Sequence, residues 1–449
     1  MISQNELEKI REEKLGDGIG DSTGLSWAFG IAPVVAELPV EIYNEDKILL
    51  RELAKKVAEI ASRPEQDNKY KLWRRHNALE ETSPLLCCEP ESAWHEIFPA
   101  KTIVCKTPLA RVWEFKLRRE IYWATVIHDD RPILPRFAIQ TVFHQTSRGL
   151  EPVLHGQALG HAYNWEAPVT SFDKLDELKP QKIIIDEEKT QELLSLAEEI
   201  FDGLLLVREE GVFWWSLGMT GDLIHLRGFE QMMMDMYDNP DFLHKMMTFL
   251  RDEVQQKLTY LEENGYLTAN TDVDYVGTGG YGYTTELPVT GKGLKLRDIW
   301  GYCESQETVL ISPAQFKEFI FPYQEDILKR FGLNVYGCCE PVEKRWDAVS
   351  KIERLRKVAV SPWSDVRLAA QQMGKAYVYV RKVNPAHMAV PHMLEDAARA
   401  ELRETFEATK EYGCPVEVLM RDVVTLGGNP DNAANWVEIA REEAARVYG

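Results

Sequence analysis

A short apolar run that ends in a polar cluster is the feature of this sequence best suited to chemistry. The segment Leu333–Pro341, LNVYGCCEP, passes from apolar residues to a glycine, two adjacent thiols and a carboxylate. We expect a buried strand that ends just before the glycine and carries Cys338, Cys339 and Glu340 at its tip. In a barrel of alternating strands and helices, side chains at this end of a strand form the active site. The alternative is that both cysteines are buried and pack as small apolar side chains.

Carboxylates near other predicted strand ends are further candidates. Glu304, in WGYCESQET, is a candidate proton donor or ligand, and its alternative is a helix-capping or arginine-paired carboxylate. Asp272 and Asp274 alternate along NTDVDYVGTGG, so they share one face of a strand, where they would bind substrate or a cation, or cap the next loop. Asp422 lies near the last predicted strand, in VEVLMRDVVTLGGNP. The candidate catalytic residues are Glu304, Glu340 and Asp274.

Aromatic side chains are concentrated at or near the same predicted strand ends. Stacking and cation–π contacts from such side chains would bind an aromatic compound or a quaternary ammonium ion. The alternative for each of them is a place in the packed core of the barrel. His387 follows Val-Asn-Pro at a strand end and is a candidate proton donor. The substrate-binding candidates are Trp214, Trp215, Tyr281, Tyr302, Tyr336, Trp363 and His387.

The elements that must position these residues alternate regularly over the second half of the chain. Short apolar runs, among them predicted strands at Val212–Ser216 and from Asp272 to Gly282, are followed by stretches with apolar residues at helical spacing. This alternation is typical of a parallel α/β sheet, and a count of about eight strands favours a closed (β/α)8 TIM-type barrel. We predict an N-terminal, mainly helical extension over residues 1–125 and the barrel over residues 126–449.

Composition and charge exclude several classes of function. The 449 residues include 52 Lys and Arg against 72 Asp and Glu, which gives a formal net charge of −20. A nucleic-acid-binding protein needs clustered basic residues, so we expect no nucleic-acid partner. The apolar runs are far shorter than the ~20 residues of a membrane span, and the first residues lack a signal-peptide core. We therefore expect a cytoplasmic protein without membrane contact, whose 7 cysteines form no disulfide framework.

Several phrases along residues 130–449 resemble the uroporphyrinogen decarboxylase superfamily. They are VTSFDKLDELKP at Val169–Pro180, LRGFEQMMMDMYDNPDFLHKMM at Leu226–Met247, ISPAQFKEFIFPYQEDIL at Ile311–Leu328 and then LNVYGCCEP, in the order found in that family. Its decarboxylases carry an arginine-rich glycine loop near the N-terminus, and this sequence has no such phrase. The resemblance is therefore closer to the corrinoid-dependent methyltransferases of the superfamily.

The metal site of those methyltransferases is matched only in part. Their strand aligned with LNVYGCCEP ends in histidine, any residue and cysteine, and a second cysteine lies near the last strand. Here Tyr336 takes the histidine position, Cys338 takes the cysteine position, and Asp422 near the last strand replaces a thiol. Thiolate and carboxylate are zinc ligands, and a catalytic site keeps one position open. The candidate zinc ligands are Cys338, Glu304 and Asp422, and the metal-free alternative uses Glu340 or Glu304 as an acid.

The resemblance implies a methyltransferase that moves a methyl group from a methoxylated aromatic compound or a methylamine to the cob(I)alamin of a partner corrinoid protein. Zinc or a proton donor would activate the leaving heteroatom. Two other interpretations remain: a uroporphyrinogen decarboxylase-like decarboxylase, and a barrel that binds a ligand without catalysis. Association into a homo-oligomer is also left open.

Overall fold

A parallel sheet of six strands runs through the centre of the protein. The computed structural model describes residues 35, 37–155, 164–272, 275–278 and 280–449. Most residues of the strands are buried on both faces, which is why each strand reads as an almost continuous apolar run. In spatial order the strands are β1 (Leu85–Cys88), β12 (Val416–Met420), β11 (Val378–Lys382), β10 (Leu355–Val360), β9 (Leu333–Tyr336) and β8 (Trp300–Cys303), and all neighbours are parallel.

A second parallel ladder pairs β2 (Arg136–Gln140) with β7 (Leu206–Glu210). Side chains bridge the gaps between the two ladders. The Asn270 side chain bonds both the amide and the carbonyl of Trp300 in β8, and the Asp130 carboxylate accepts the amide of Leu86 in β1. The α/β class with parallel strands is therefore confirmed. No ladder within the described ranges joins β1 to β2 or β7 to β8, so the closed eight-stranded barrel stays a prediction.

Several predicted elements differ from the structure. The strand in LNVYGCCEP is confirmed, because β9 ends at Tyr336. The strand predicted at Val212–Ser216 is wrong, because that segment is irregular, and the described part of Asp272–Gly282 contains turns, bends and irregular chain but no strand. The strand before the first segment is β7, which ends at Glu210, and glycines break the second. Strand β1 lies inside residues 1–125 and pairs with β12, so this range supplies a strand to the sheet as well as helices.

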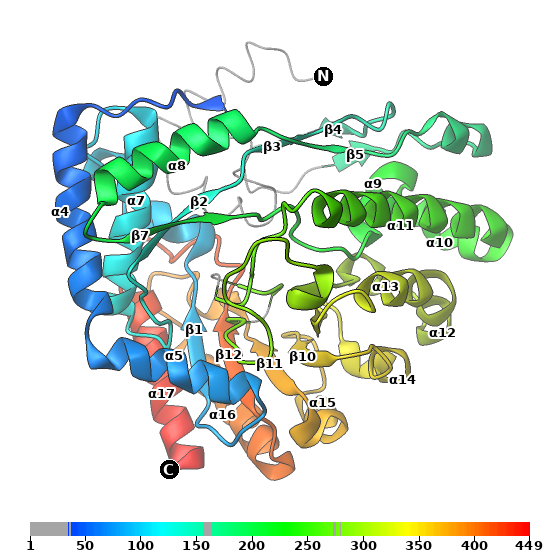
Figure 1. Cartoon of the computed structure of the whole chain (residues 1–449). Coiled ribbons are helices and arrows are strands. Elements are labelled where there is room, and N and C mark those ends of the chain that lie inside the picture. Colours follow the sequence, from blue (N-terminus) through cyan, green and yellow to red (C-terminus); the bar gives the residue numbers. More distant parts are fainter. Residues whose placement is uncertain (1–34, 36, 156–163, 273–274, 279) are drawn as a thin grey trace.

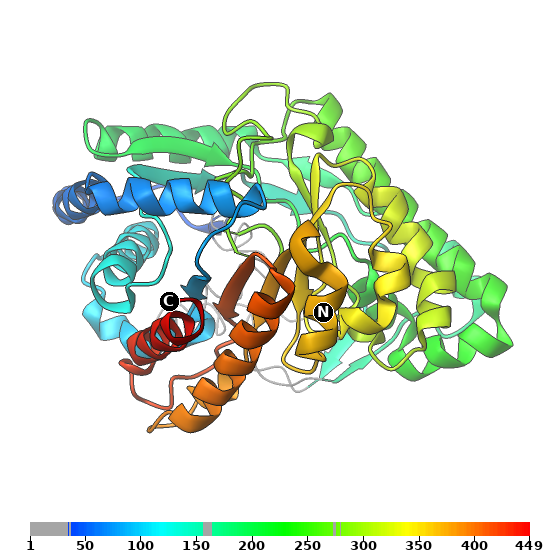
Figure 2. The same cartoon turned by 90° about the horizontal axis from the view of Figure 1, so that it is seen from below.

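Helices cover the outside of the strands, as Figures 1 and 2 show. Local signals set their ends: Asp186 and Asp365 accept backbone amides as N-caps, and Gly413 ends a helix in the left-handed conformation. No helix in the described ranges is long and apolar enough to cross a lipid bilayer. The longer helices are α4 (Asn44–Ala61), α5 (Pro64–Asn77), α7 (Pro108–Tyr122), α8 (Glu187–Phe201), α9 (Thr220–Arg227), α10 (Phe229–Asp238), α11 (Pro240–Glu263), α13 (Phe321–Leu328), α15 (Val366–Met373), α16 (Glu395–Tyr412) and α17 (Asn432–Tyr448). The remaining elements are α6 (Trp94–Ile97), α12 (Pro313–Gln315), α14 (Trp346–Val349) and two antiparallel pairs, β3 (Phe143–Gln145) with β6 (Ile183–Ile185) and β4 (Val153–His155) with β5 (Asn164–Glu166).

Aromatic side chains of the loop before β8 fill the space enclosed by the strands. Tyr281 stacks on Tyr283 and meets Trp73 of α5 edge-on, with ring centroids 5.4 and 5.2 Å apart. A fully buried ion pair of 2.8 Å joins Lys357 of β10 to Glu417 of β12, and the Lys357 ammonium also donates to the Tyr281 carbonyl at 3.0 Å. The interior is therefore packed, and the polar side chains that follow the strands form a cluster at their carboxyl ends.

Candidate functional site

Polar and reactive side chains meet at the carboxyl ends of four strands of the six-stranded sheet, two on each side of β10. Because parallel strands end at the same edge of a sheet, residues far apart in sequence come together there. Glu304 follows β8, the pair Cys338 and Cys339 follows β9, Lys382 is the last residue of β11, and Asp422 follows β12. The structure thus brings together Cys338 and Asp422 from the predicted site, and adds Lys382.

The Lys382 ammonium lies at the centre of the two thiols and Asp422. It donates to the Cys339 sulfur at 3.2 Å and the Cys338 sulfur at 3.4 Å, and it pairs with the Asp422 carboxylate at 2.7 Å. A hydrogen bond from Cys338 and the charge of Lys382 lower the pKa of Cys339, against the effect of burial. Burial lowers the pKa of Lys382, but Cys338, Asp422 and Cys339 together raise it well above its usual value. The cluster is therefore built around a permanent positive charge.

That ammonium takes the place that the sequence assigns to zinc. Nowhere in the described ranges do three or more His, Cys, Asp or Glu side chains form a group that could hold a metal ion. A zinc ion seated between Cys338 and Asp422 would lie ~4 Å from the Lys382 charge, a repulsion on the order of 8 kcal/mol at an effective dielectric constant of about 20. Zinc also needs four ligands in a structural site or three and a water in a catalytic one. The two thiols and Asp422 are therefore arranged around the Lys382 ammonium and do not form a zinc site.

Glu304 is a buried carboxyl group whose surroundings favour its protonated form. Its side chain is 3% exposed and accepts the Gln306 amide at 2.9 Å. Burial raises the pKa of Glu304 well above its usual value, and the negative charges of Glu307 and Glu340 add to the shift, while the Gln306 amide and the Ser216 hydroxyl lower it in part. A neutral carboxyl group with a raised pKa is the form in which a glutamate acts as a general acid near neutral pH.

Glu340 is the other candidate acid from the sequence, and it differs from Glu304 in its hydrogen-bond partners. Its two carboxylate oxygens accept the Ser305 amide at 2.8 Å and the Cys338 amide at 2.9 Å. Both amides belong to the segments that follow β8 and β9. Glu340 therefore holds the two strand ends in register and positions Cys338, and Glu304 stays the candidate acid.

An aromatic cavity lies along β8, next to this cluster. It has a volume of about 60 Å³, and Trp215 and Tyr302 meet edge-on in its wall with ring centroids 5.7 Å apart. The Tyr302 hydroxyl lies 3.4 Å from the Gly337 carbonyl, directly before Cys338. Burial raises the pKa of Tyr302 well above its usual value, and Cys338 and Glu304 add to the shift. The lining residues are Gly211, Val212, Phe213, Trp214, Trp215, Asn270, Tyr275, Val276, Gly277, Trp300, Gly301 and Tyr302.

Four of the other substrate-binding candidates lie away from this cavity. Tyr336 points to the outer face of β9, where its hydroxyl donates to the Gln324 side chain at 2.7 Å. Tyr281 is packed in the interior. Trp363 is 71% exposed on the loop after β10, and His387 lies 3.3 Å from Glu401. The structure therefore brings together only Trp214, Trp215 and Tyr302 of the predicted set.

Of the predicted aspartate pair, Asp274 lies outside the described residues. Its neighbour Asp272 pairs with two guanidinium groups, Arg136 at 2.8 Å and Arg208 at 2.5 Å. These ion pairs tie the loop before β8 to the β2–β7 ladder. Asp272 therefore anchors this loop, a role that differs from both the substrate-binding and the loop-capping predictions.

Sequence reasoning missed Lys382 and a second cluster after β1. Lys382 ends the apolar run VYVRK, and this could have indicated a polar cluster, because a buried ammonium group needs charged or polar partners. After β1, the Glu89 carboxylate accepts the Trp94 indole at 2.7 Å and the Tyr275 hydroxyl at 3.0 Å, and Glu91 pairs with Arg421 at 2.7 Å. These contacts join β1, β12 and the loop before β8 at the same edge.

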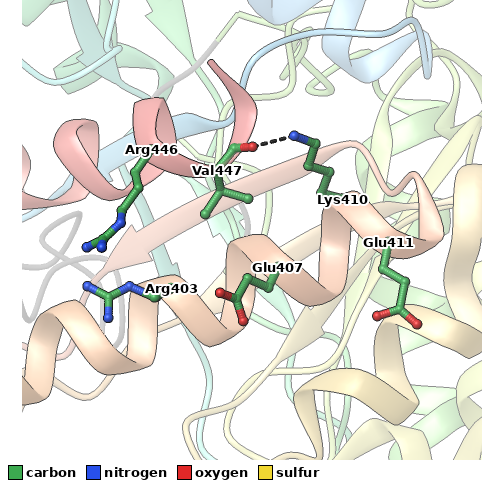
Figure 3. Close-up of a pocket in the computed structure, with 6 residues that line it drawn as sticks. All are labelled: Arg403, Glu407, Lys410, Glu411, Arg446 and Val447. Atoms are coloured by element: carbon green, nitrogen blue, oxygen red, sulfur yellow. Dashed lines mark hydrogen bonds between the residues drawn. The ribbon is translucent and has the colours of Figure 1, made fainter.

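A wider hollow of about 440 Å³ lies on the surface between α16 and α17 (Figure 3). The part of α16 that lines it leads into the amino end of β12, so the hollow lies on the side opposite the carboxyl ends. It contains no predicted site residue. Its lining is Arg403, Glu407, Lys410, Glu411, Arg446 and Val447, and all but the last are charged.

No protein-family model matches this sequence, and no curated protein sequence matches it. Among solved structures, a methyltransferase from Methanosarcina mazei is similar to this chain, with a TM-score of 0.46 and 10% sequence identity. The similarity covers 85% of this chain and 99% of that chain. Likeness at this level does not extend to activity.

Proposed function

We propose that this protein is a methyltransferase that takes a methyl group from a small methoxylated aromatic compound, with Glu304 as general acid. The acceptor in this proposal is the cob(I)alamin of a partner corrinoid protein. The observation that carries it is a buried carboxyl group with a raised pKa, two residues after Tyr302, which lines an aromatic cavity along β8. The resemblance of residues 130–449 to corrinoid-dependent methyltransferases supports the same reaction. We also propose that the eight parallel strands close into a (β/α)8 barrel with this end open.

The proton on Glu304 would make the oxygen of the methyl donor a better leaving group. An aryl methyl ether is unreactive because phenolate is a poor leaving group. The carboxyl proton of Glu304 would move to the ether oxygen while the methyl–oxygen bond breaks, so that a neutral phenol leaves and Glu304 becomes a carboxylate. The acceptor provides the electron pair for the new bond to the methyl group. General acid catalysis of this kind contributes about 10²–10⁴-fold to a rate.

Neighbouring residues have supporting roles in this proposal. Trp215 and Tyr302 would contact the aromatic ring of the donor by stacking. Cys339 and Asp422 are the more exposed members of the cluster and form the rim on the side from which a corrinoid protein would approach. The Lys382 ammonium lies between Cys338 and Asp422, so the proposal uses no zinc. Metal analysis of protein purified without chelator checks this, since zinc at one per chain that is lost in Cys338→Ala would contradict it.

A methyl-transfer assay tests the proposed function. The protein is mixed with cob(I)alamin and a panel of methoxylated aromatic compounds and methylamines, and the absorbance change to methylcobalamin is followed. We expect turnover with at least one methoxylated aromatic compound and none with Glu304→Gln. Release of CO₂ from a porphyrinogen without methyl transfer would contradict the proposal and favour a decarboxylase. Tight binding of a donor without turnover, in the presence of a corrinoid protein, would favour the non-catalytic barrel.

A further inference from the structure

The chain contains two pairs of adjacent cysteines, and the backbone places them differently. Cys87 and Cys88 lie within β1, where successive side chains point to opposite faces, and both are buried. Cys338 and Cys339 follow Gly337, whose φ of 94° turns the chain out of β9. Their sulfur atoms lie 3.5 Å apart, against ~2.05 Å in a disulfide bond, so they are two free thiols in contact.

We propose that Cys338 and Cys339 form a dithiol site for a trivalent arsenical, a neutral compound with one organic group and two hydroxyl groups on arsenic. Each thiol gives its proton to one hydroxyl group, two sulfur–arsenic bonds form, two arsenic–oxygen bonds break, and two water molecules leave. The oxidation state of arsenic does not change, so the reaction needs no oxidant or reductant. Because Cys339 is partly exposed, the compound can reach the pair from the rim of the site. This proposal does not depend on methyl transfer.

The surroundings of the pair select a neutral, three-coordinate centre over a zinc ion. The Lys382 ammonium lies 3.2 and 3.4 Å from the two sulfurs, so it repels a dication but not a neutral molecule. Asp422, the nearest carboxylate, is already paired with Lys382 at 2.7 Å and would have to leave it to bind zinc. A trivalent arsenic centre needs only two sulfurs, because it brings its third substituent.

The test uses phenylarsine oxide as the probe on the full-length, reduced and folded protein. Intact-mass spectrometry should show one adduct per chain that survives a monothiol and is removed by ethanedithiol. Cys338→Ser and Cys339→Ser should each abolish the resistant adduct. Cys87→Ala and Cys88→Ala are the matched controls and should keep it, because the sulfurs of that pair lie on opposite faces of a strand. Circular dichroism verifies that each variant is folded.

Competition with zinc tests the selectivity. An equal concentration of Zn²⁺ should leave adduct formation by the wild-type protein unchanged, whereas Lys382→Met should bind zinc at least about tenfold more tightly than the wild type does. The proposal is overturned if folded wild-type protein forms no resistant adduct, or if Cys339→Ser keeps it. Adduct loss in Cys87→Ala, or protection of the wild type by equimolar zinc, would overturn it as well.

Discussion

Replacing Glu304 with glutamine should stabilise the protein at neutral pH while it removes the proposed proton donor. Burial and the charges of Glu307 and Glu340 raise the pKa of Glu304, so the folded chain keeps a proton that the unfolded chain releases above about pH 4.3. Glutamine has the same shape and is neutral at every pH. Its carbonyl oxygen can accept the Gln306 amide, as the carboxyl group does at 2.9 Å.

The expected magnitude follows from proton linkage. Each pH unit over which Glu304 is protonated in the folded chain and ionised in the unfolded chain lowers the unfolding free energy by about 1.4 kcal/mol. Because the pKa is raised on folding, the contribution is fully present below the unfolded pKa and is lost as pH rises through the folded pKa. Between pH 5 and pH 7, the wild-type protein should therefore lose up to about 2.7 kcal/mol relative to Glu304→Gln.

Urea unfolding followed by tryptophan fluorescence at pH 5, 6 and 7 measures this difference. Glu286→Gln is the matched control, because a hydrogen bond from Arg356 lowers the pKa of Glu286. Its contribution to stability is fully present above the unfolded pKa of about 4.3 and is lost only at lower pH, so Glu286→Gln should show no pH-dependent difference from the wild type between pH 5 and pH 7. Parallel stability curves for the wild type and Glu304→Gln would mean that Glu304 is ionised in the fold. That result would refute its assignment as the acid.

Three further changes test other parts of the structure. Lys357→Met removes the ammonium partner of the buried Glu417 carboxylate and should cost about 3–5 kcal/mol of unfolding free energy in urea. Glu417→Leu in the double variant should restore part of this loss, since it also removes the acceptor of the Gly280 amide. Trp215→Ala removes an edge-on partner of Tyr302 and should raise the KM for an aromatic donor about tenfold, with little change in kcat. The expected size follows from an aromatic contact worth about 0.5–1.5 kcal/mol and from the apolar area that it buries. Gly337→Ala adds a Cβ 2.7 Å from Val342 at a φ of 94° and should lower stability by at least about 1–3 kcal/mol in thermal unfolding.

The sequence predicted the strand-and-thiol segment well because every signal there is local. An apolar run, a glycine and two thiols occur within Leu333–Pro341, and β9 ends where the glycine follows. Strand β1 was missed because LLCC is short and lies in a region of mixed aromatic and charged residues. Its place in the sheet depends on pairing with β12, more than 300 residues away, which no local pattern encodes.

The directions in which the side chains of the site point were harder to predict from the sequence. Tyr302 pairs with Val335, and Cys303 pairs with Tyr336, in the register of β8 and β9. Since neighbouring residues of a strand face opposite sides, Tyr302 faces the cavity and Tyr336 faces the helices. A shift of one residue in that register would place both tyrosines on the same face of the sheet. The partners of the Lys382 ammonium could not be predicted from the sequence either, because they follow two other strands.

The comparison of Glu304→Gln with Glu340→Gln in the methyl-transfer assay tests the central claim most directly. Rates of methylcobalamin formation are measured at saturating donor and corrected for the folded fraction of each variant. If Glu304 is the acid, Glu304→Gln should lose about 10²–10⁴-fold in kcat with an unchanged donor Kd. Glu340→Gln should chiefly lose stability, because Glu340 holds the ends of β8 and β9. Full activity in Glu304→Gln, or a loss confined to Glu340→Gln, would contradict the account.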